Sequence, residues 1–553
     1  MKTMAFPDYT PTIPEFIRTR VAAFGDRPLI MLGDRRITYR DAADESTRLA
    51  RGLVASGIGK GDRVGLLMPN GPDWVVTWLA ATRIGAVVVP MNTFYKPREL
   101  GWVMRHADVR MLLAVPRYLS NDYLERLETV APRLARQKAE SLLLPELPCL
   151  RGVTVWGETD RSWTRSARNL EAAVDAQPAI DADFLAELES CVAPADPMIV
   201  IYSSGSTADP KGAIHTHGTV LRHSLNLNQF RDLTPEDRVF SPMPFFWVGG
   251  FVFTLLSSMH AGAFMLCEEA FDPGQTLLLL ERERATLAGG WPHYAKAMMD
   301  HPSFRERDLS SIRSGNLYAL LPDELRPSDP ELRSNSLGMT ESCGPHTIDR
   351  MDYDLPERLR GSFGCAPEGV EHKVVDPESG ETLPTGSDGE ICVRGYNVMQ
   401  GLYKLEREQV FDRDGFYHTG DGGHFDAEGR LFFQARLGDM IKTAGANVTP
   451  RELEVLMEAL PEVQSAFVVG VPDPARGQNV AVALVLDSGH ELSASECRRR
   501  LRDEISAYKL PRHYFFYAKA DLPFTDSGKM DKRKLAGMLA ERIEAGDIGE
   551  PGS

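Results

Sequence analysis

Three features of the sequence predict an α/β fold with a large first part and a smaller α+β unit at the end. Short β-branched runs alternate with helix-spaced apolar patterns near the start, strands and tight turns dominate a later stretch, and the last segment combines strand runs with helices. The early alternation favours right-handed crossovers between parallel strands, with helices on both faces. A length of 553 residues allows roughly three or four folding units with large cores.

The elements before residue 118 follow one another as helix and strand. Residues 118–195 mix leucines, prolines and charges without a period, and no element is assigned there. A buried-strand pattern at 197–202 then leads into a loop of small residues, and a helix pattern follows it from Thr219. The earlier elements are predicted as helices at 41–56 and 74–84 and as strands at 64–68, 87–89 and 111–115.

One uncharged segment, Ser241 to Cys267, has the length of a membrane span. Prolines, glycines and a histidine interrupt it. A span needs about 20 mostly apolar residues without such breaks. We therefore expect a buried loop, helix and strand that form a pocket wall.

The last third of the chain shows a change of pattern. Glycines and aspartates punctuate short alternating runs from Val370 to Phe433, which predicts strands and tight turns. A final unit follows, with strands expected at 465–471 and 480–486 and a helix beginning at Ser493. Ser493 and Glu496 have the S-x-x-E spacing of a capping box.

Composition and charge exclude several classes of protein. With 43% apolar and 25% charged residues, the chain is neither disordered nor fibrous. A net charge of −16 argues against a general nucleic-acid binder but allows small anionic substrates. The seven cysteines show no C-x-x-C spacing, so no zinc site and no structural metal are expected. The first residues contain no apolar run of signal-peptide length. Together with the scattered cysteines, this feature predicts reduced thiols in a cytoplasmic protein.

The strongest local signal is the loop that follows the strand at 197–202. Its small residues allow tight turns whose N–H groups face an anion, and its hydroxyls and lysine add donors and charge. Pro210 and Gly212 flank the lysine where a Walker A motif has Gly and Ser or Thr, so it is not that motif. A polar surface turn is the alternative. The loop supplies Ser203, Ser204, Gly205, Ser206, Thr207 and Lys211 as candidate phosphate-binding residues.

With this loop, the chain resembles the adenylate-forming enzymes, which include acyl-CoA synthetases, peptide-synthetase adenylation domains and firefly luciferase. The resemblance covers about residues 12 to 540, and the motifs are specific because they occur together and in order. The further motifs are residues 335–341 for adenine and magnesium, 417–421 for ribose, 429–445 around the hinge, and 523–529 for the C-terminal lysine loop.

The resemblance assigns a role to five side chains. Glu341 would hold Mg²⁺ on the triphosphate, and Thr340 would donate to the α-phosphate. Asp421 would accept both ribose hydroxyls, while Arg436 would reach the ribose or a phosphate. Lys529 would stabilise charge on the α-phosphate during adenylation. Each residue could instead have an ordinary structural role, as a turn aspartate, a surface arginine or a lysine that solvates a loop.

The resemblance also implies the domain organisation. It predicts a large ATP- and acyl-binding domain at 1–436, a hinge at 437–438, and a small mobile domain at 439–553 that rotates between two half-reactions. Gly438 stands where the family commonly has Asp or Lys, and its backbone freedom keeps rotation feasible. Further residues are assigned by position: Gly315, Asn316, Leu337 and Gly338 to ATP, and Gly445, Lys442 and Trp247 to the CoA tunnel.

The acyl group is expected to be apolar. The uncharged segment 241–267 has no Lys or Arg to pair with a second carboxylate, and its aromatic residues suit an apolar wall. Plain core packing is the equal alternative, and Trp247 replaces a common histidine. The pocket is assigned to Phe245, Phe246, Trp247, Gly250 and Met339.

The predicted function is an ATP-dependent carboxylic acid–CoA ligase. It would activate an apolar acid, most simply a fatty acid, as acyl-AMP, release pyrophosphate and transfer the acyl group to CoA, using ATP and Mg²⁺. Aryl and steroid side-chain acids stay open as substrates. An acyl-AMP ligase that loads a carrier protein, a luciferase-like oxygenase and a nucleotide-binding homologue without turnover are the alternatives. No nucleic acid and no transmembrane segment is expected, and the oligomeric state is open, a homodimer included.

Overall fold

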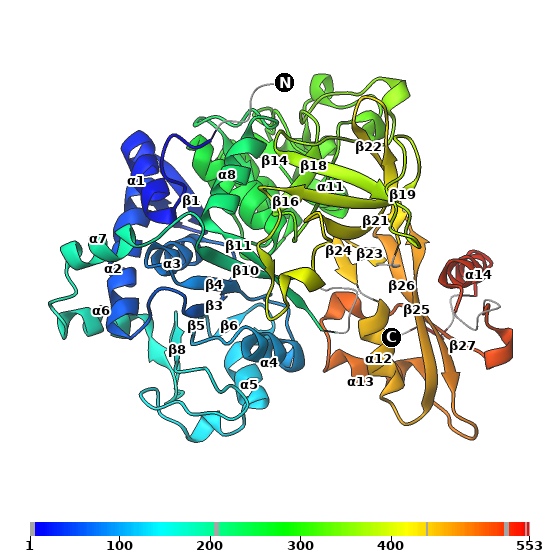
Figure 1. Ribbon diagram of the computed structural model, residues 1–553, viewed down its shortest axis with the longest axis horizontal. Coiled ribbons are helices and arrows are strands. Elements are labelled where there is room, and N and C mark those ends of the chain that lie inside the picture. The colour runs from blue at the N-terminus through cyan, green and yellow to red at the C-terminus, as the bar shows by residue number, and fades with distance from the viewer. Residues whose placement is uncertain are drawn as a thin grey trace. The chain divides into compact units, whose positions relative to one another are not determined.

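The chain divides into two compact units in a computed structural model (Figure 1). The structure describes residues 6–203, 209–437, 441–448, 450–524, 530–547 and 550–551. The first unit holds residues 1–93, 104–202 and 212–435, and the second holds 94–103, 203–211 and 436–553. The fold is α/β, with several mixed sheets and helices, as the sequence predicts.

The first unit contains an eight-stranded sheet with the order β20-β11-β10-β4-β3-β5-β8-β9. Its central strands are parallel, because β3 pairs with β4 and with β5 in parallel register. The strands are β3 (Arg63–Leu67), β4 (Val87–Pro90), β5 (Met111–Ala114), β8 (Gly152–Val155), β9 (Arg165–Ser166), β10 (Pro197–Ser203), β11 (Lys211–Thr216) and β20 (Gly401–Leu402).

Two further sheets complete the strands of the first unit, apart from the short pair β6 (Arg117–Tyr118) and β7 (Asn121–Asp122). One sheet has the order β14-β12-β13-β1-β2, formed by β1 (Pro28–Leu32), β2 (Arg35–Thr38), β12 (Arg238–Phe240), β13 (Phe264–Cys267) and β14 (Leu287–Ala288). The other has the order β15-β16-β17-β22-β21-β19-β18, formed by β15 (Ser336–Met339), β16 (Gly344–Ile348), β17 (Ser362–Cys365), β18 (Val370–Val375), β19 (Gly389–Gly395), β21 (Tyr417–Phe425) and β22 (Arg430–Arg436).

The helices of the chain up to residue 299 are interspersed with these strands along the sequence. Helix α3 contributes Trp74 and Trp78 to the main core, where both are completely buried and stacked at 6.2 Å. The helices are α1 (Ile13–Phe24), α2 (Tyr39–Ala55), α3 (Pro72–Arg83), α4 (Pro97–His106), α5 (Tyr123–Val130), α6 (Ala167–Asp175), α7 (Ala182–Ser190), α8 (His217–Asn228), α9 (Ser257–Ala261), α10 (Pro273–Arg282) and α11 (Pro292–Met299).

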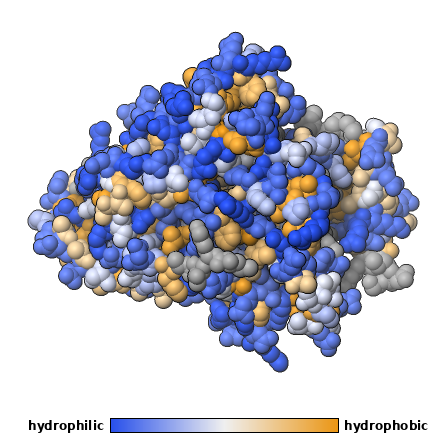
Figure 2. Space-filling model, turned by 90° about the horizontal axis from the view of Figure 1, so that it is seen from above, coloured by the Kyte–Doolittle hydropathy of each residue, from blue (hydrophilic) through white to orange (hydrophobic). Residues whose placement is uncertain are grey.

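The uncharged segment 241–267 forms a loop, a π-helix over Gly249–Leu256, helix α9 and strand β13. Gly250 is required here, because a Cβ atom on it would lie 2.1 Å from the carbonyl oxygen of Pro244. The expected loop, helix and strand are therefore confirmed. Across the described residues, no helix combines the length and the apolar character that a membrane crossing requires. The face drawn in Figure 2 mixes hydrophilic and hydrophobic residues.

The second unit is built on a sheet in which β26 pairs with β25, β23 and β27. The two-residue turn Ala444–Gly445 joins β23 to β24 with both φ angles positive, at 49° and 79°, which a glycine accommodates without strain. The elements are β23 (Ile441–Thr443), β24 (Ala446–Val448), α12 (Pro450–Glu458), β25 (Val463–Asp473), β26 (Gly477–Leu486), α13 (Ala494–Arg502), β27 (His513–Phe516), α14 (Lys532–Glu544) and β28 (Glu550–Pro551).

The start of α13 differs in part from the predicted capping box. Ser493 is the N-cap and accepts a hydrogen bond from the Glu496 N–H. The Glu496 carboxylate, however, pairs with the guanidinium groups of Arg499 and Arg500 at 2.8 and 2.7 Å. Two nearby cations attract the carboxylate more strongly than one backbone amide, which explains the difference.

Candidate active site

The residues Thr340 and Glu341 lie at the tip of a β-hairpin in the seven-stranded sheet. Strands β15 and β16 are antiparallel, and Met339 is paired with Gly344, so residues 340–343 form the connection. The Cys343 N–H closes it by donating to the Thr340 carbonyl at 3.1 Å. Cys343 and Gly344 both have positive φ, at 58° and 117°. The hairpin geometry thus places the two predicted functional residues outside the regular strand ladder.

Three groups from other elements fix the backbone of this hairpin tip. His215, on β11, contacts the Thr340 carbonyl through its Nε2 at 2.8 Å. The Met399 N–H donates to the Glu341 carbonyl at 2.8 Å, and the Asn397 amide donates to the Ser342 carbonyl at 3.1 Å. Three consecutive carbonyls are therefore anchored, which orients the side chains between them.

The imidazole of His215 is neutral. It is completely buried, and this burial lowers its pKa to about 4. Because a carbonyl only accepts hydrogen bonds, the proton of the neutral ring lies on Nε2. A second buried histidine, His223 on α8, contacts the Pro345 carbonyl of the same hairpin at 3.0 Å, and burial lowers its pKa to about 3. Uncharged donors thus hold the hairpin.

Asp421 lies in a β-bulge between β19 and β21. Cys392 is paired with His418, and Glu390 is paired with Gly422, so four steps along β21 match two along β19. Gly420 has a φ of 70°, which permits the sharp turn. Bulges of this kind redirect a side chain next to functional sites. The predicted ribose-binding residue is therefore placed by an irregularity of the sheet.

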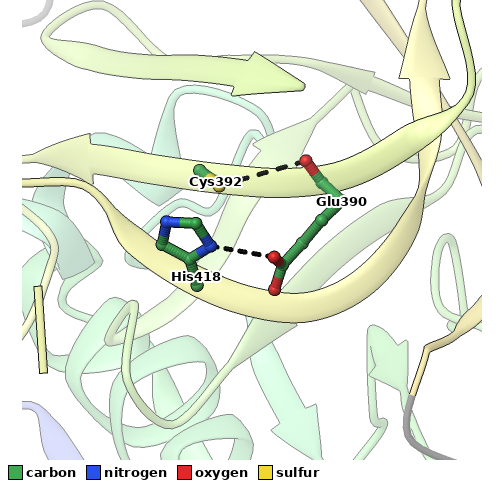
Figure 3. Close-up of side chains that lie close together, drawn as sticks. All are labelled: Glu390, Cys392 and His418. Carbon is green, nitrogen blue, oxygen red and sulfur yellow. Dashed lines mark hydrogen bonds and ion pairs between the residues drawn. The ribbon is translucent and has the colours of Figure 1, made fainter. Parts of the chain in front are cut away.

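Side chains from β19 and from the bulge hold the bulge in place. Figure 3 shows one of these contacts, between Glu390 and His418. The Glu390 carboxylate accepts the Gly420 N–H at 3.0 Å with one oxygen and contacts His418 Nδ1 at 2.8 Å with the other. The Thr419 hydroxyl donates to the Ile391 carbonyl at 2.6 Å and accepts the Asp421 N–H at 3.0 Å. Asp421 itself is 4% exposed.

Leu337, the residue expected to contact adenine, lies on β15. Its side chain is buried in a small cluster with Ile391 and Leu431. Gly338 is the exposed position of β15, and a Cβ atom on it would lie 2.6 Å from the Gly344 backbone. The strand thus offers a bare backbone at position 338.

Gly315 and Asn316 form a hydrogen-bonded loop beside Gly290. Gly315 has a φ of 125°, and a Cβ there would lie 2.0 Å from the Ala288 carbonyl oxygen. The Asn316 amide forms two hydrogen bonds with Gly290, donating to its carbonyl at 2.7 Å and accepting its N–H at 2.9 Å. Asn316 therefore fixes the backbone next to Trp291.

The predicted acyl-pocket residues fall into two groups. Phe245 is completely buried and packs edge-on against Trp74 at 5.3 Å, so it belongs to the main core. Phe246 and Trp247 contact each other at 5.2 Å, and Trp247 is partly exposed. Met339 is 9% exposed at the base of the hairpin. Phe245 is thus part of a buried cluster, while Trp247 reaches the surface.

Several predicted residues lie outside the described part of the chain. They are Ser204, Gly205, Ser206, Thr207, Gly438 and Lys529, together with the side chain of Arg436. Among the others, Ser203 ends β10 and Lys211 begins β11. Lys442 is exposed on β23, next to the turn that contains Gly445.

Sequence reasoning missed the residues that anchor the two turns, namely His215, Asn397, Glu390 and His418. His215 could have been noticed, because it follows the predicted phosphate loop on a strand, where it is buried between two partly exposed neighbours. His418 lies inside the predicted ribose motif at 417–421, but the resemblance assigns it no role there, and no local pattern marks Asn397 or Glu390. Two cavities of about 450 and 190 Å³ in the first unit are lined by none of the predicted site residues.

Two protein-family models match this chain. The model of the AMP-binding enzyme family matches residues 17–403, and that of the AMP-binding enzyme C-terminal domain matches residues 452–529. Feruloyl-CoA synthase from Amycolatopsis sp. is 32% identical over 91% of this chain and 94% of its own length. The mitochondrial medium-chain acyl-CoA ligase ACSF2 from Mus musculus is 30% identical over 96% of this chain and 88% of its own length.

Solved structures share the fold. The amide bond synthetase McbA from Marinactinospora thermotolerans superimposes with a TM-score of 0.75 at 24% identity, covering 95% of this chain and 99% of that one. A fatty acyl CoA synthetase from Mycobacterium tuberculosis gives a TM-score of 0.63 at 25% identity, covering 96% and 99%. The chain belongs to the AMP-binding enzyme family. It is a ligase of the AMP-forming acyl-CoA synthetase type, a class that uses ATP and CoA.

Proposed function

We propose that this enzyme activates an apolar carboxylic acid, a fatty acid, and transfers it to CoA. A carboxylate oxygen attacks the α-phosphorus of ATP, the bond to the bridging oxygen breaks, and pyrophosphate leaves. The thiol of CoA then attacks the acyl carbon, and AMP leaves as the thioester forms. Such chemistry depends mainly on positioning and on neutralising charge.

This proposal is supported by the position of Thr340, Glu341 and Asp421, the residues predicted to bind the nucleotide, on two irregularities of one sheet. The hairpin tip presents Thr340 and Glu341, and the bulge presents Asp421, with their backbones anchored on several sides. Substrate-binding side chains need such fixed positions, because a small displacement weakens transition-state contacts. Carboxylates at these two places fit Mg²⁺ bound to phosphate and two ribose hydroxyls, respectively.

The remaining roles involve the second unit. Lys529 would neutralise charge on the α-phosphate, and a rotation at Gly438 would then replace it with the thiol path past Lys442, Gly445 and Trp247. In this proposal the large domain comprises 1–436, the hinge 437–438 and the mobile domain 439–553. The absence of charge from Ser241 to Cys267 supports an apolar acyl group.

A panel of carboxylic acids tests the proposal. AMP release is measured with ATP, Mg²⁺ and each acid, with and without CoA, using short, long, aromatic and polycyclic acids. We expect turnover with fatty acids and CoA-dependent thioester formation. Pyrophosphate exchange without CoA consumption would instead identify an enzyme that loads a carrier protein. No acid-dependent exchange with any member of the panel would overturn the proposal.

A variant separates the two half-reactions. Lys529→Ala should reduce acyl-adenylate formation by roughly 10²-fold or more, because the ammonium acts on the charged phosphorus centre. Thioester formation from pre-formed acyl-adenylate should be much less affected. Equal damage to both half-reactions would contradict the role given to Lys529.

A further inference from the structure

Glu390, Cys392 and His418 form a compact group of three potential metal ligands, and His418 is itself part of the predicted ribose motif (Figure 3). Glu390 and Cys392 are two positions apart on β19, and Cys392 is the direct cross-strand partner of His418 on β21. Residues at i and i+2 of a strand share one face, as do directly paired residues. One ligand atom from each residue lies within 4.8 Å of the others.

The donor set favours one class of cation. A carboxylate oxygen, a thiol sulfur and an imidazole nitrogen suit Zn²⁺ and similar borderline-soft ions, whereas Mg²⁺ and Ca²⁺ prefer oxygen alone. His418 Nδ1 and the Glu390 oxygen are 2.8 Å apart. With metal–ligand distances of about 2.1 Å, two tetrahedral ligands are about 3.4 Å apart. The distance between His418 Nδ1 and the Glu390 oxygen therefore needs to increase by only about 0.6 Å for the ion to replace the proton that the two atoms share.

The surrounding charges are compatible with a divalent ion. Asp412 lies 3.7 Å from His418 Nε2 and pairs with Lys373 at 2.6 Å, so these two charges offset each other. Glu390 then leaves one negative charge on the group. A bound divalent ion with a thiolate, whose proton passes to solvent, brings the group to neutrality. His418 has 39% of its side chain exposed, which gives an approach from solvent.

We propose that Glu390, Cys392 and His418 bind a borderline-soft divalent cation of the Zn²⁺ class, and that its binding disturbs the Asp421 bulge. The coupling follows from Glu390, which accepts the Gly420 N–H and contacts His418. A metal bound to this carboxylate redirects its lone pairs and moves His418. Occupation of the site therefore weakens ATP binding through the turn that carries Asp421.

Cobalt spectroscopy of the reduced, metal-free, full-length protein tests the site. Co²⁺ bound to a thiolate gives a sulfur-to-metal charge-transfer band, which we expect in the wild type, with displacement by Zn²⁺ and not by Mg²⁺. Cys392→Ser should abolish the band. Cys365→Ser is the matched control, because Cys365 is a partly buried thiol of the same sheet outside the cluster, and it should keep the band. No wild-type band, or a band that survives in Cys392→Ser, would overturn the proposal.

The coupling is tested by ATP binding, measured calorimetrically with and without Zn²⁺. We expect the dissociation constant for ATP to rise about fivefold or more with Zn²⁺ in the wild type, and to stay unchanged in Cys392→Ser. Metal binding with unaltered ATP affinity would refute the coupling. His418→Gln serves as a second variant should Cys392→Ser melt at a lower temperature than the wild type. The cobalt spectrum needs no turnover, so its failure is distinct from failure of the proposed ligase activity.

Discussion

The hairpin tip at 340–343 and the bulge at 419–421 belong to one sheet but are stabilised by opposite means. The hairpin is held by completely buried, neutral His215 and His223, which contact backbone carbonyls. The bulge is held by Glu390, whose side chain is 16% exposed and which pairs with the 39% exposed His418. Close packing around uncharged groups stabilises the hairpin tip, and a partly solvated carboxylate stabilises the bulge.

The difference also appears in the space around the backbone. An added Cβ atom at Gly338, in the hairpin, would lie 2.6 Å from the backbone of Gly344, whereas one at Gly420, in the bulge, would meet nothing within 4 Å. Close contact with neighbouring backbone thus fixes the hairpin, while the hydrogen bonds made by Glu390 and Thr419 fix the bulge. We expect the hairpin to tolerate substitution poorly and the bulge to respond to ions and to loss of single contacts.

The largest effect is expected for Gly338→Ala. The new methyl group would press on backbone that cannot move away, and overpacking of this kind costs up to about 3 kcal/mol. Thermal unfolding should show a marked decrease in melting temperature together with loss of acid-dependent pyrophosphate exchange. A melting temperature equal to that of the wild type would contradict the close packing described for the hairpin.

Removal of the carboxylate that holds the bulge comes next. Glu390→Ala leaves the Gly420 N–H without its charged acceptor, which is worth about 1.5–3 kcal/mol. We expect the KM for ATP to rise about tenfold or more, with kcat less affected, because the bulge carries a binding residue. Glu390→Gln keeps one acceptor and should lie between the two. An unchanged KM in Glu390→Ala would show that the bulge does not depend on this contact.

His215→Leu tests the hairpin through its buried donor. The Thr340 carbonyl would lose the hydrogen bond from Nε2, at a cost of about 2 kcal/mol. Here we expect kcat for adenylation to decrease about tenfold with little change in KM for ATP, the reverse of the Glu390 result. His215→Gln, which restores an N–H donor, should recover part of the rate. If kcat and KM changed in the same proportion in His215→Leu and Glu390→Ala, the proposed difference between the hairpin and the bulge would be wrong.

The buried histidines also predict how stability depends on pH. In the unfolded chain His215 is protonated below its ordinary pKa of about 6.5, whereas burial lowers the pKa in the folded protein to about 4. The unfolded state therefore binds more protons in this interval. Stability is complete above pH 6.5 and decreases as the pH falls toward 4, by about 1.4 kcal/mol per pH unit for this residue. Melting temperatures of His215→Gln should fall less steeply than those of the wild type over the same interval.

Much of the fold could be predicted from the sequence because local patterns report it. Apolar periodicity predicted α2, α3 and the parallel strands β3, β4 and β5 to within a few residues. The bulge could not be predicted, because it depends on which residue of β19 faces which of β21. The proximity of Cys392 and His418 has the same origin, since cysteine spacing along the chain says nothing about a cross-strand partner. The burial of Leu337 likewise depends on the distant residues Ile391 and Leu431.

The smallest effect is expected for Gly420→Ala, which tests the bulge without touching its contacts. Because nothing lies within 4 Å of the added Cβ, the only penalty is the positive φ of 70°, which costs an alanine about 1 kcal/mol. We expect a small decrease in melting temperature and an increase of about fivefold or less in the KM for ATP. If the substitution instead abolished activity as Gly338→Ala is expected to, the bulge would be as tightly enclosed as the hairpin. A measurable but mild effect would show that Glu390 and Thr419, rather than packing, determine the conformation of this turn.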